Sequence, residues 1–274
     1  MKQVVQIRCK NNKKTQKVAN GSTLSDIFSS FNLKMEHGPV SAKVNNKVEG
    51  MHYRVYNNKD IEFLDMRTSS GSRAYTRTLF FVLCKAVQDL YPGHDVVIDI
   101  PVSNGFYVDV RLERDVTADD VDCIRKRMQE IVDARMPIRR YMVPTEDAIA
   151  LFEEKGDVEK VKLLRTSGSL YTTYYKIGEY VDFYYGTLLT NTSQLYLFGL
   201  EKYYDGMLLR IPSLKNPDEL GEVTRQDKMF EIFKEHHHWQ DIIGIRTVGD
   251  FNAAVDAGHA TDAVSYTHLR AHET

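Results

Sequence analysis

The most compact group of possible metal ligands in the sequence is the run His236, His237 and His238. Consecutive residues on a helix point about 100° apart, so three adjacent histidines cannot converge on one ion. No cysteine or carboxylate at ligand spacing completes a site there. We therefore interpret this run as a solvated helix face. Four further histidines are isolated and carry no ligand signal: His37, His52, His94 and His259.

Nucleophiles and nucleotide-binding loops are equally scarce. Cys9, Cys84 and Cys123 are scattered and form no C-x-x-C pair, which favours a reducing compartment and buried thiols. The sequence contains no G-x-x-x-x-G-K-[ST] loop for nucleotide phosphates, and no G-x-G-x-x-G, H-E-x-x-H or G-x-S-x-G motif. We therefore predict no catalytic residue, no metal ligand and no cofactor-binding residue in this chain.

Tyrosines and basic residues are the remaining candidates, and both could contact nucleic acid. Stacking of an exposed tyrosine on an unpaired base is worth ~1–3 kcal/mol. Inward-facing tyrosines on strands are the favoured interpretation, because aromatic residues are enriched in strands. Basic groups at 13–14, 125–127 and 139–140 could contact phosphates, but ordinary ion pairing along a helix explains residues 125–127 equally well. The tyrosines concerned are Tyr171, Tyr174, Tyr175, Tyr180, Tyr184, Tyr185, Tyr196, Tyr203 and Tyr204.

Length and composition are those of a folded protein with room for two domains. Hydrophobic residues make up 42% and charged residues 27% of the 274 residues, and the net charge is −2. That charge argues against a dedicated duplex-binding protein. No apolar run approaches the ~20 residues that span a bilayer, and the N-terminus has no signal-peptide core. We expect a cytoplasmic protein without membrane contact.

Residues 1–66 are expected to form a compact α+β unit. Val4 and Ile7 belong to a first strand, and Thr23 precedes a helix that carries Leu24 and Ile27 on one face. Short strands follow, near 41–44, 46–50 and 61–65. The polar run at 68–72 predicts a hinge between domains and the preferred site of proteolysis.

The following region alternates helices and strands. Helices are expected over 75–90 and 119–135 and from Pro144 to Phe152, with two strands at 96–102 and 105–112. The stretch from Val161 to Pro212 is β-like, with its first strand at 161–164. A helix from about Thr224 to Ile243 and a shorter one near 251–255 form a connector over 213–264. The last ten residues, SYTHLRAHET, match no earlier pattern. We interpret 265–274 as a non-native tail of cloning origin, with the true C-terminus further on.

Several stretches resemble known families. VVQIRCK, ANGSTLSDI and NNKDIEFLD, within residues 1–66, resemble a TGS domain, which has a ubiquitin-like β-grasp fold. LCKAVQDLYPG, IDIPVSNGFYVDV, TEDAIALFEEKGDVEKVKLL and YYKIGEYVDFYYGTLLTNTSQL resemble the editing domain of threonyl-tRNA synthetase. The resemblance implies an α+β protein with a β-grasp domain at 1–66 and an editing-like domain, of the threonyl/alanyl-tRNA synthetase type, at 67–212. The helical connector at 213–264 would follow these two domains.

The next stretch, QDKMFEIFKEHHHWQDIIGIRTVGDFN, resembles the N-terminal half of bacterial nucleoside (uridine-type) kinases. That resemblance implies a regulatory or binding region of an ATP-dependent uridine or cytidine kinase. The connector would dock on a following P-loop kinase domain, whose reaction would use ATP or GTP and magnesium. Two alternatives stay open: a fragment of a threonyl-tRNA synthetase that binds tRNA, or a free-standing TGS protein that binds RNA or a nucleotide.

The synthetase resemblance also identifies four positions. The editing cleft of that family combines H-x-x-x-H on a helix with C-x-x-x-H on a later strand and turn. The matching positions here are Arg77, Phe81, Tyr184 and Leu188. Phe and Leu bind no metal, and Arg stays protonated. We therefore predict a degenerate site, without zinc at these positions and without hydrolysis of mischarged Ser-tRNA.

Overall fold

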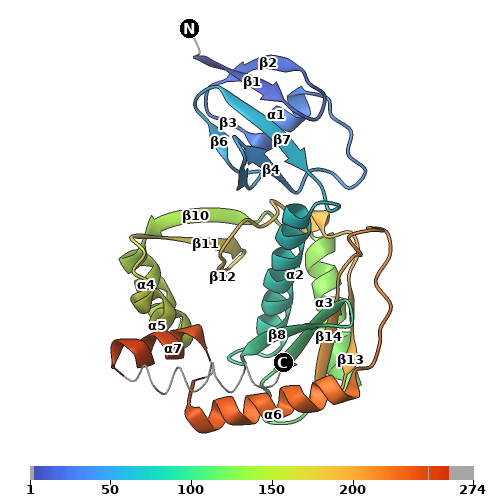
Figure 1. Ribbon diagram of the computed structural model, residues 1–274, viewed down its shortest axis with the longest axis vertical. Coiled ribbons are helices and arrows are strands. Elements are labelled where there is room, and N and C mark those ends of the chain that lie inside the picture. The colour runs from blue at the N-terminus through green and yellow to red at the C-terminus, as the bar shows by residue number, and fades with distance from the viewer. Residues whose placement is uncertain (1–2, 246, 259–274) are drawn as a thin grey trace. The chain divides into compact units, whose positions relative to one another are not determined.

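The computed structural model describes residues 3–245 and 247–258, and within them it is a mixed α+β protein with several sheets (Figure 1). The described residues form two compact units. The first comprises the chain up to Arg140 together with Tyr175–Val223, and the second comprises Tyr141–Tyr174 together with the described residues from Thr224 on. No helix within the described residues is long and apolar enough to cross a membrane. The predicted tail at 265–274 lies outside the described residues.

The N-terminal part of the first unit is a five-stranded sheet that carries one short helix. Strand β1 (Val4–Cys9) is antiparallel to β2 (Thr15–Ala19) and parallel to β7 (Lys59–Leu64), and β7 is antiparallel to β4 (Ser41–Val44). The helix α1 (Leu24–Ser30) begins at a capping box in which Thr23 and Asp26 bind each other's backbone amides. In order across the sheet, the strands are β2 (Thr15–Ala19), β1 (Val4–Cys9), β7 (Lys59–Leu64), β4 (Ser41–Val44) and β5 (Lys47–Glu49); a two-stranded sheet pairs β3 (Ser22–Thr23) with β6 (Arg54–Val55).

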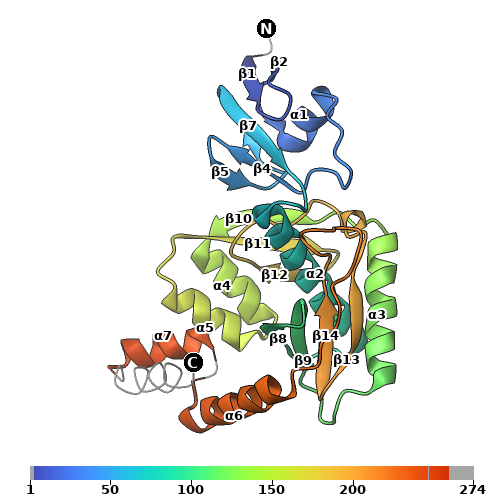
Figure 2. The same cartoon turned by 45° about the vertical axis from the view of Figure 1, so that its right-hand side comes forward.

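The rest of the first unit is built around two long helices, α2 (Ser69–Leu90) and α3 (Ala118–Asp133). They pack against a four-stranded antiparallel sheet through a shared apolar core that includes Leu79, Ile124 and Met207 (Figure 2). In order across that sheet, the strands are β13 (Gly199–Tyr203), β14 (Gly206–Arg210), β9 (Gly105–Val110) and β8 (Val96–Val102).

The predicted hinge at 68–72 is instead the first turn of α2, so that prediction was wrong. Thr68 caps the helix, and its Oγ1 accepts a hydrogen bond from the Gly71 amide at 3.1 Å. Gly71 is buried, and a Cβ atom there would lie 1.9 Å from the carbonyl oxygen of Asp65. Polar Thr and Ser residues indicate a loop and a helix N-cap alike, and here the cap is formed.

The second unit contains four helices and the ends of two strands. Its boundaries with the first unit lie within β10 (Arg139–Pro144) and β11 (Tyr171–Ile177), which form a three-stranded sheet with β12 (Tyr180–Phe183) in the order β10-β11-β12. The helices of the second unit are α4 (Thr145–Glu154), α5 (Val158–Thr166), α6 (Asp227–Ile243) and α7 (Val248–Asp256); strand β12 and a short 3-10 helix, η1 (Thr192–Gln194), belong to the first unit.

The strand expected at 161–164 is part of helix α5. Asp157 caps this helix by accepting a hydrogen bond from the Lys160 amide, and Val161 and Leu164 are the residues it buries. Two apolar residues three positions apart fit a helix, but a run of four residues is too short to separate a helix from a strand. The expected connector helices are present as α6 and α7. The expected division at 66/67 and 212/213 stays a prediction.

Candidate functional site

The structure brings together, in the first unit, the four positions that the synthetase resemblance identifies. Arg77 and Phe81 lie one turn apart on α2, whereas Tyr184 follows β12 and Leu188 lies in the loop after it. The Phe81 ring makes an edge-to-face contact with Tyr184 at a centroid distance of 5.8 Å. Phe81 and Leu188 are fully buried in the same apolar core. We call Phe81, Tyr175, Tyr180 and Tyr184 the aromatic cluster.

Arg77 binds the loop that contains the later two positions. Its Nε and Nη2 atoms donate to the carbonyl oxygen of Thr187 at 3.2 and 3.1 Å. Gly186 makes room for this contact, because a Cβ atom there would lie 2.8 Å from the Arg77 Cζ atom. Burial lowers the pKa of the Arg77 guanidinium. A guanidinium has no lone pair to offer a metal, so Arg77 is a structural donor here.

The tyrosines of the aromatic cluster are hydrogen-bonded and neutral. Burial raises the pKa of Tyr184 and of Tyr180, and nearby Cys84 and Asp182 raise both further. The Tyr180 hydroxyl donates to Asp182 Oδ2 at 3.2 Å, and the Tyr175 hydroxyl donates to the Gly186 carbonyl at 2.9 Å. A phenol with a raised pKa keeps its proton at neutral pH, so none of these hydroxyls is a general base.

Asp182 and Cys84 are polar members of this region that sequence reasoning missed as partners of the site. Asp182 is a buried carboxylate, and its Oδ1 accepts a hydrogen bond from the Phe183 amide at 2.7 Å. Cys84 lies one turn after Phe81 on α2, beside Tyr184. The spacing of 81 and 84 on one helix face was a usable signal for Cys84. No signal identified Asp182, because an Asp within an apolar strand also fits the exposed face.

The histidine run lies on α6, in the second unit, whereas the four positions belong to the first unit. The His237 ring packs against Phe233, one turn earlier, at a centroid distance of 4.3 Å. His238 is exposed, and the side chain of His236 lies outside the described part of the structure. A metal interpretation of the run gains no support from these positions.

The tyrosines divide between packing and exposure. Tyr175 is buried, Tyr174 stacks on Tyr141 at 5.1 Å, and Tyr203 packs edge-to-face with Tyr204 at 4.6 Å. Tyr171, Tyr185 and Tyr196 are exposed, although Tyr196 also stacks on His37. The first group packs as predicted, whereas the rings of Tyr171 and Tyr185 are available for stacking on a base.

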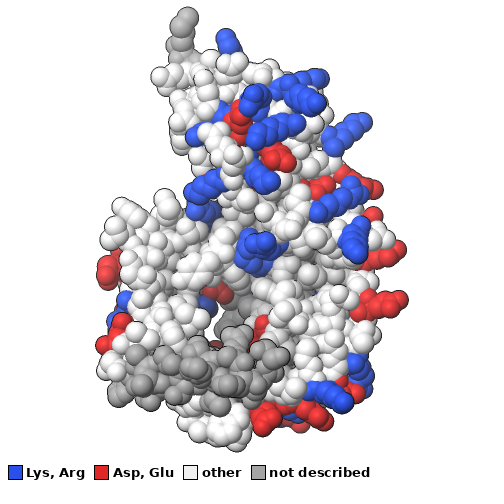
Figure 3. Space-filling view, viewed as in Figure 1, with Lys and Arg blue, Asp and Glu red and all other residues white. Residues whose placement is uncertain are grey.

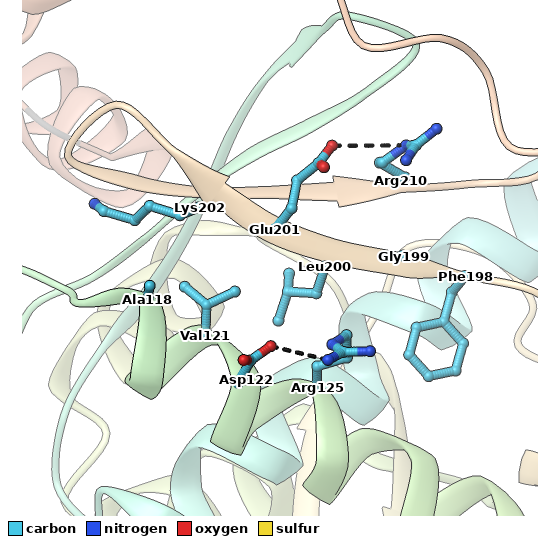
Figure 4. A pocket seen from close by; sticks show the side chains of 10 residues that line it. All are labelled: Ala118, Val121, Asp122, Arg125, Phe198, Gly199, Leu200, Glu201, Lys202 and Arg210. Carbon is cyan, nitrogen blue, oxygen red and sulfur yellow. Dashed lines mark hydrogen bonds and ion pairs between the residues drawn. The ribbon is translucent and has the colours of Figure 1, made fainter.

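A charged pocket of about 360 Å³ lies between the start of α3 and the edge strand β13 (Figure 4). Arg125 donates to Asp122 at 2.9 Å on the α3 side, and Glu201 lies 3.7 Å from Arg210 on the strand side. Arg127 pairs likewise with Glu130, so Arg125 and Arg127 both form the ion pairs expected along α3. None of the four degenerate positions lines the pocket.

Comparison with known proteins shows similarity to one class of enzyme. No family model matches the chain. Curated relatives named threonine–tRNA ligase include one from Syntrophotalea carbinolica, 31% identical over 227 residues, covering 79% of this chain and 36% of that protein. The ligases of Marinobacter nauticus and Acetivibrio thermocellus are each 28% identical over 181 residues, covering 66% of this chain and 28% of theirs. The chain thus spans about a third of the length of these relatives.

These relatives correct the expected kinase identity. They are threonine–tRNA ligases, so the interpretation as part of a uridine or cytidine kinase, and the transferase activity attached to it, was wrong. The predicted partner, a following P-loop kinase domain, is overturned by the same finding. That interpretation depended on residues 226–252, an amphipathic helical stretch of a kind that many connectors share. The expectation of ATP or GTP and magnesium rested on that kinase domain and stays a prediction. The chain is similar over most of its length to part of a threonine–tRNA ligase.

Proposed function

We propose that this chain is the N-terminal region of a threonyl-tRNA synthetase-like protein, and that it binds tRNA without hydrolysing an aminoacyl ester. The observation that carries the proposal is the convergence of Arg77, Phe81, Tyr184 and Leu188 at one place, with none of them able to act as a base or a ligand. The similarity to threonine–tRNA ligases supports the identity of the longer protein. A cytoplasmic location stays a prediction.

The architecture supports the proposed TGS and editing-like domains. A sheet of order β2-β1-β7-β4-β5 with the single helix α1 is the arrangement expected for a TGS-like β-grasp domain. In the proposed editing-like domain, the long helix α2 carries the first two of the four positions, and β12 leads into the other two. That is the helix-and-turn arrangement that the synthetase resemblance implies.

The distribution of charge supports RNA binding by the N-terminal sheet. Residues 1–66 contain 11 Lys and Arg against 6 Asp and Glu, whereas the rest of the chain contains 25 against 32. The overall charge of −2 hides this asymmetry. Lys and Arg side chains gather over the N-terminal sheet in Figure 3. A local positive surface is what contact with a phosphate backbone requires.

Three of these cations share the outer face of the sheet. The exposed residues of β1 alternate with its buried ones, so Arg8 and the following Lys10 point outward. Lys17 of β2 pairs with Gln6, another exposed residue of β1, and therefore lies on the same face. Asp60 neutralises Arg8 through an ion pair, so Lys10 and Lys17 carry most of the positive potential of this face.

Ester hydrolysis needs a base or a metal-bound water beside the carbonyl carbon. Phe81 and Leu188 supply neither, and the Arg77 guanidinium is bound to a backbone carbonyl. The raised pKa of Tyr184 keeps its phenol protonated. An aminoacyl-tRNA that reached this place would keep its ester bond, so binding is proposed to be the retained function.

A tRNA-binding titration tests the proposal. The triple variant Lys10→Ala, Lys14→Ala and Lys17→Ala removes three exposed cations. We expect its Kd for tRNA to rise about tenfold or more at moderate salt, and the slope of log K against log salt to fall by about one per lysine that contacts phosphate.

The matched control removes three exposed lysines elsewhere in the first unit: Lys126, Lys202 and Lys215. It should leave the Kd within a factor of about two. Equal weakening by both triple variants would show that tRNA does not use the N-terminal sheet. No measurable tRNA binding at low salt and micromolar protein would overturn the proposed function itself.

A further inference from the structure

His37 is a nearly buried histidine whose Nε2 atom makes no hydrogen bond within the described residues. It lies between α1 and β4, its side chain is 11% exposed, and its ring stacks on Tyr196 at 4.4 Å and 12°. The Nε2 atom is 3.3 Å from Asp218 Oδ1, but among the described residues no group meets it in hydrogen-bond geometry. A short separation without hydrogen-bond alignment contributes little to satisfying the nitrogen. A buried ring nitrogen without a hydrogen bond is costly unless something binds it.

Two carboxylates lie close to the His37 ring. One oxygen each from Glu36 and Asp218 and one ring nitrogen of His37 all lie within 4.8 Å of one another. Two atoms that bind zinc at ~2.0–2.2 Å are separated by about 3.4 Å in a tetrahedral site. The side chains of Glu36 and Asp218 are each 60% exposed. Rotation about their side-chain bonds can therefore shorten the separations of the three ligand atoms to those of a tetrahedral site.

The charge around this group favours a cation. Glu36, Asp218 and the nearby Asp65 face one guanidinium, that of Arg67, which forms an ion pair with Glu36. A divalent ion would neutralise the excess charge, and Arg67 would remain as an outer partner of Glu36.

We propose that Glu36, His37 and Asp218 bind a divalent transition-metal ion, zinc or manganese. One imidazole nitrogen and two carboxylate oxygens form a donor set that suits these ions, whereas magnesium and calcium prefer oxygen ligands throughout. Three protein ligands leave a further position for water. Stacking on Tyr196 fixes the plane of the His37 ring, and the Tyr196 hydroxyl donates to the Pro217 carbonyl at 3.0 Å, next to Asp218.

This ion would link two loops of the first unit that are far apart in the sequence. The expectation of no metal ligand was drawn from sequence spacing, in which His37 is isolated and Asp218 is remote. The inference does not depend on tRNA binding or on the degenerate site. Its direct consequence is stabilisation of the folded chain by the ion, since the unfolded chain cannot hold the three ligands together.

Titration calorimetry and metal analysis of the full chain, stripped with a chelator, test the proposal. We expect one equivalent of Zn²⁺ or Mn²⁺ per chain, a higher Tm with Zn²⁺, and at least tenfold weaker binding of Mg²⁺. His37→Ala and Asp218→Asn should each weaken Zn²⁺ binding by about 100-fold and abolish the rise in Tm. His94→Ala, at another isolated histidine of the first unit, should change neither.

The outcomes separate the proposal from its alternatives. Zn²⁺ binding that survives in His37→Ala would place the ion elsewhere, for instance on the histidine run of α6, and would overturn the proposal. Absence of binding at millimolar Zn²⁺ and Mn²⁺ would overturn it as well. If His37→Ala does not fold, Asp218→Asn decides the result, because Asp218 is largely exposed and its amide preserves the shape of the side chain.

Discussion

Two groups of polar side chains in the first unit differ in how completely their polar atoms are hydrogen-bonded. Around the aromatic cluster, Arg77 and Tyr175 bind backbone carbonyls, and Tyr180 binds Asp182. At Glu36, His37 and Asp218, a buried nitrogen lacks a hydrogen bond and two carboxylates lie close to its ring. Only the first group lies where the synthetase resemblance implies chemistry. The resemblance identifies where a site would lie in the fold. A buried polar atom without a hydrogen bond identifies where the chain can bind a ligand.

The largest expected effect is on stability at the aromatic cluster. Phe81→Ala removes a fully buried ring that contacts Tyr180 and Tyr184, so it should lower the free energy of unfolding by about 3–5 kcal/mol. Urea denaturation of the full chain measures this. Tyr185→Ala, at an exposed ring beside the cluster, should change stability by about 0.5 kcal/mol or less. A loss below about 1 kcal/mol for Phe81→Ala would mean that the ring lines an open site.

A smaller loss is expected when Arg77 is replaced. Arg77→Met keeps the length of the side chain but leaves the Thr187 carbonyl without its two donors. The expected loss of unfolding free energy is about 1–3 kcal/mol, the cost of a polar group deprived of its partner. Arg73→Met, one turn earlier and exposed on α2, is the matched control and should be nearly neutral. Equal effects of the two variants would show that the guanidinium does not hold the loop.

Alkaline pH should also separate the two groups. The folded-state pKa values of Tyr180 and Tyr184 are raised, so the folded chain retains protons that the unfolded chain releases above about pH 10. Their contribution is therefore complete below pH 10 and is lost as pH rises further. Tyr184→Phe should make the fall in stability between pH 9 and 11 shallower, whereas Tyr185→Phe should not. Parallel pH profiles for both variants and the native chain would contradict the burial of Tyr184.

The smallest expected effect is that of His37→Ala without added metal. The variant removes one ring stacked on Tyr196 and leaves the carboxylates solvated, so a change of about 1 kcal/mol or less in unfolding free energy is expected in the presence of a chelator. The difference in unfolding free energy between the native chain and the variant should increase when Zn²⁺ is added, because the ion stabilises only the chain that binds it. The same difference in unfolding free energy with and without Zn²⁺ would show that His37 contributes packing and no metal ligand.

Local patterns predicted much of this fold, and the failures have physical causes. Helix α2 and the hairpin of β8 and β9 have long, strongly patterned apolar faces, and both are present. The predictions of a hinge at 68–72 and of a strand at 161–164 were wrong. Short polar runs and four-residue apolar runs are compatible with more than one structure, and here they form a helix cap and part of α5.

The candidate sites divide in a similar way. The degenerate positions converge as the resemblance implies, whereas Asp182 was not anticipated beside them. The group of Glu36, His37 and Asp218 depends on a contact between loops about 180 residues apart in the sequence. No spacing rule covers such a distance, so only the folded chain reveals it.

The most direct test of the account is a single-turnover assay with Ser-tRNA in excess protein, in which binding and deacylation are measured in one sample. The account predicts bound tRNA whose ester decays at the rate seen in buffer. A variant with His at 77, 81 and 188 and Cys at 184 tests whether the identity of these four side chains is the reason that the ester is not hydrolysed. Hydrolysis by the native chain above the buffer rate, slowed by Arg77→Met or Tyr184→Phe, would contradict the central claim.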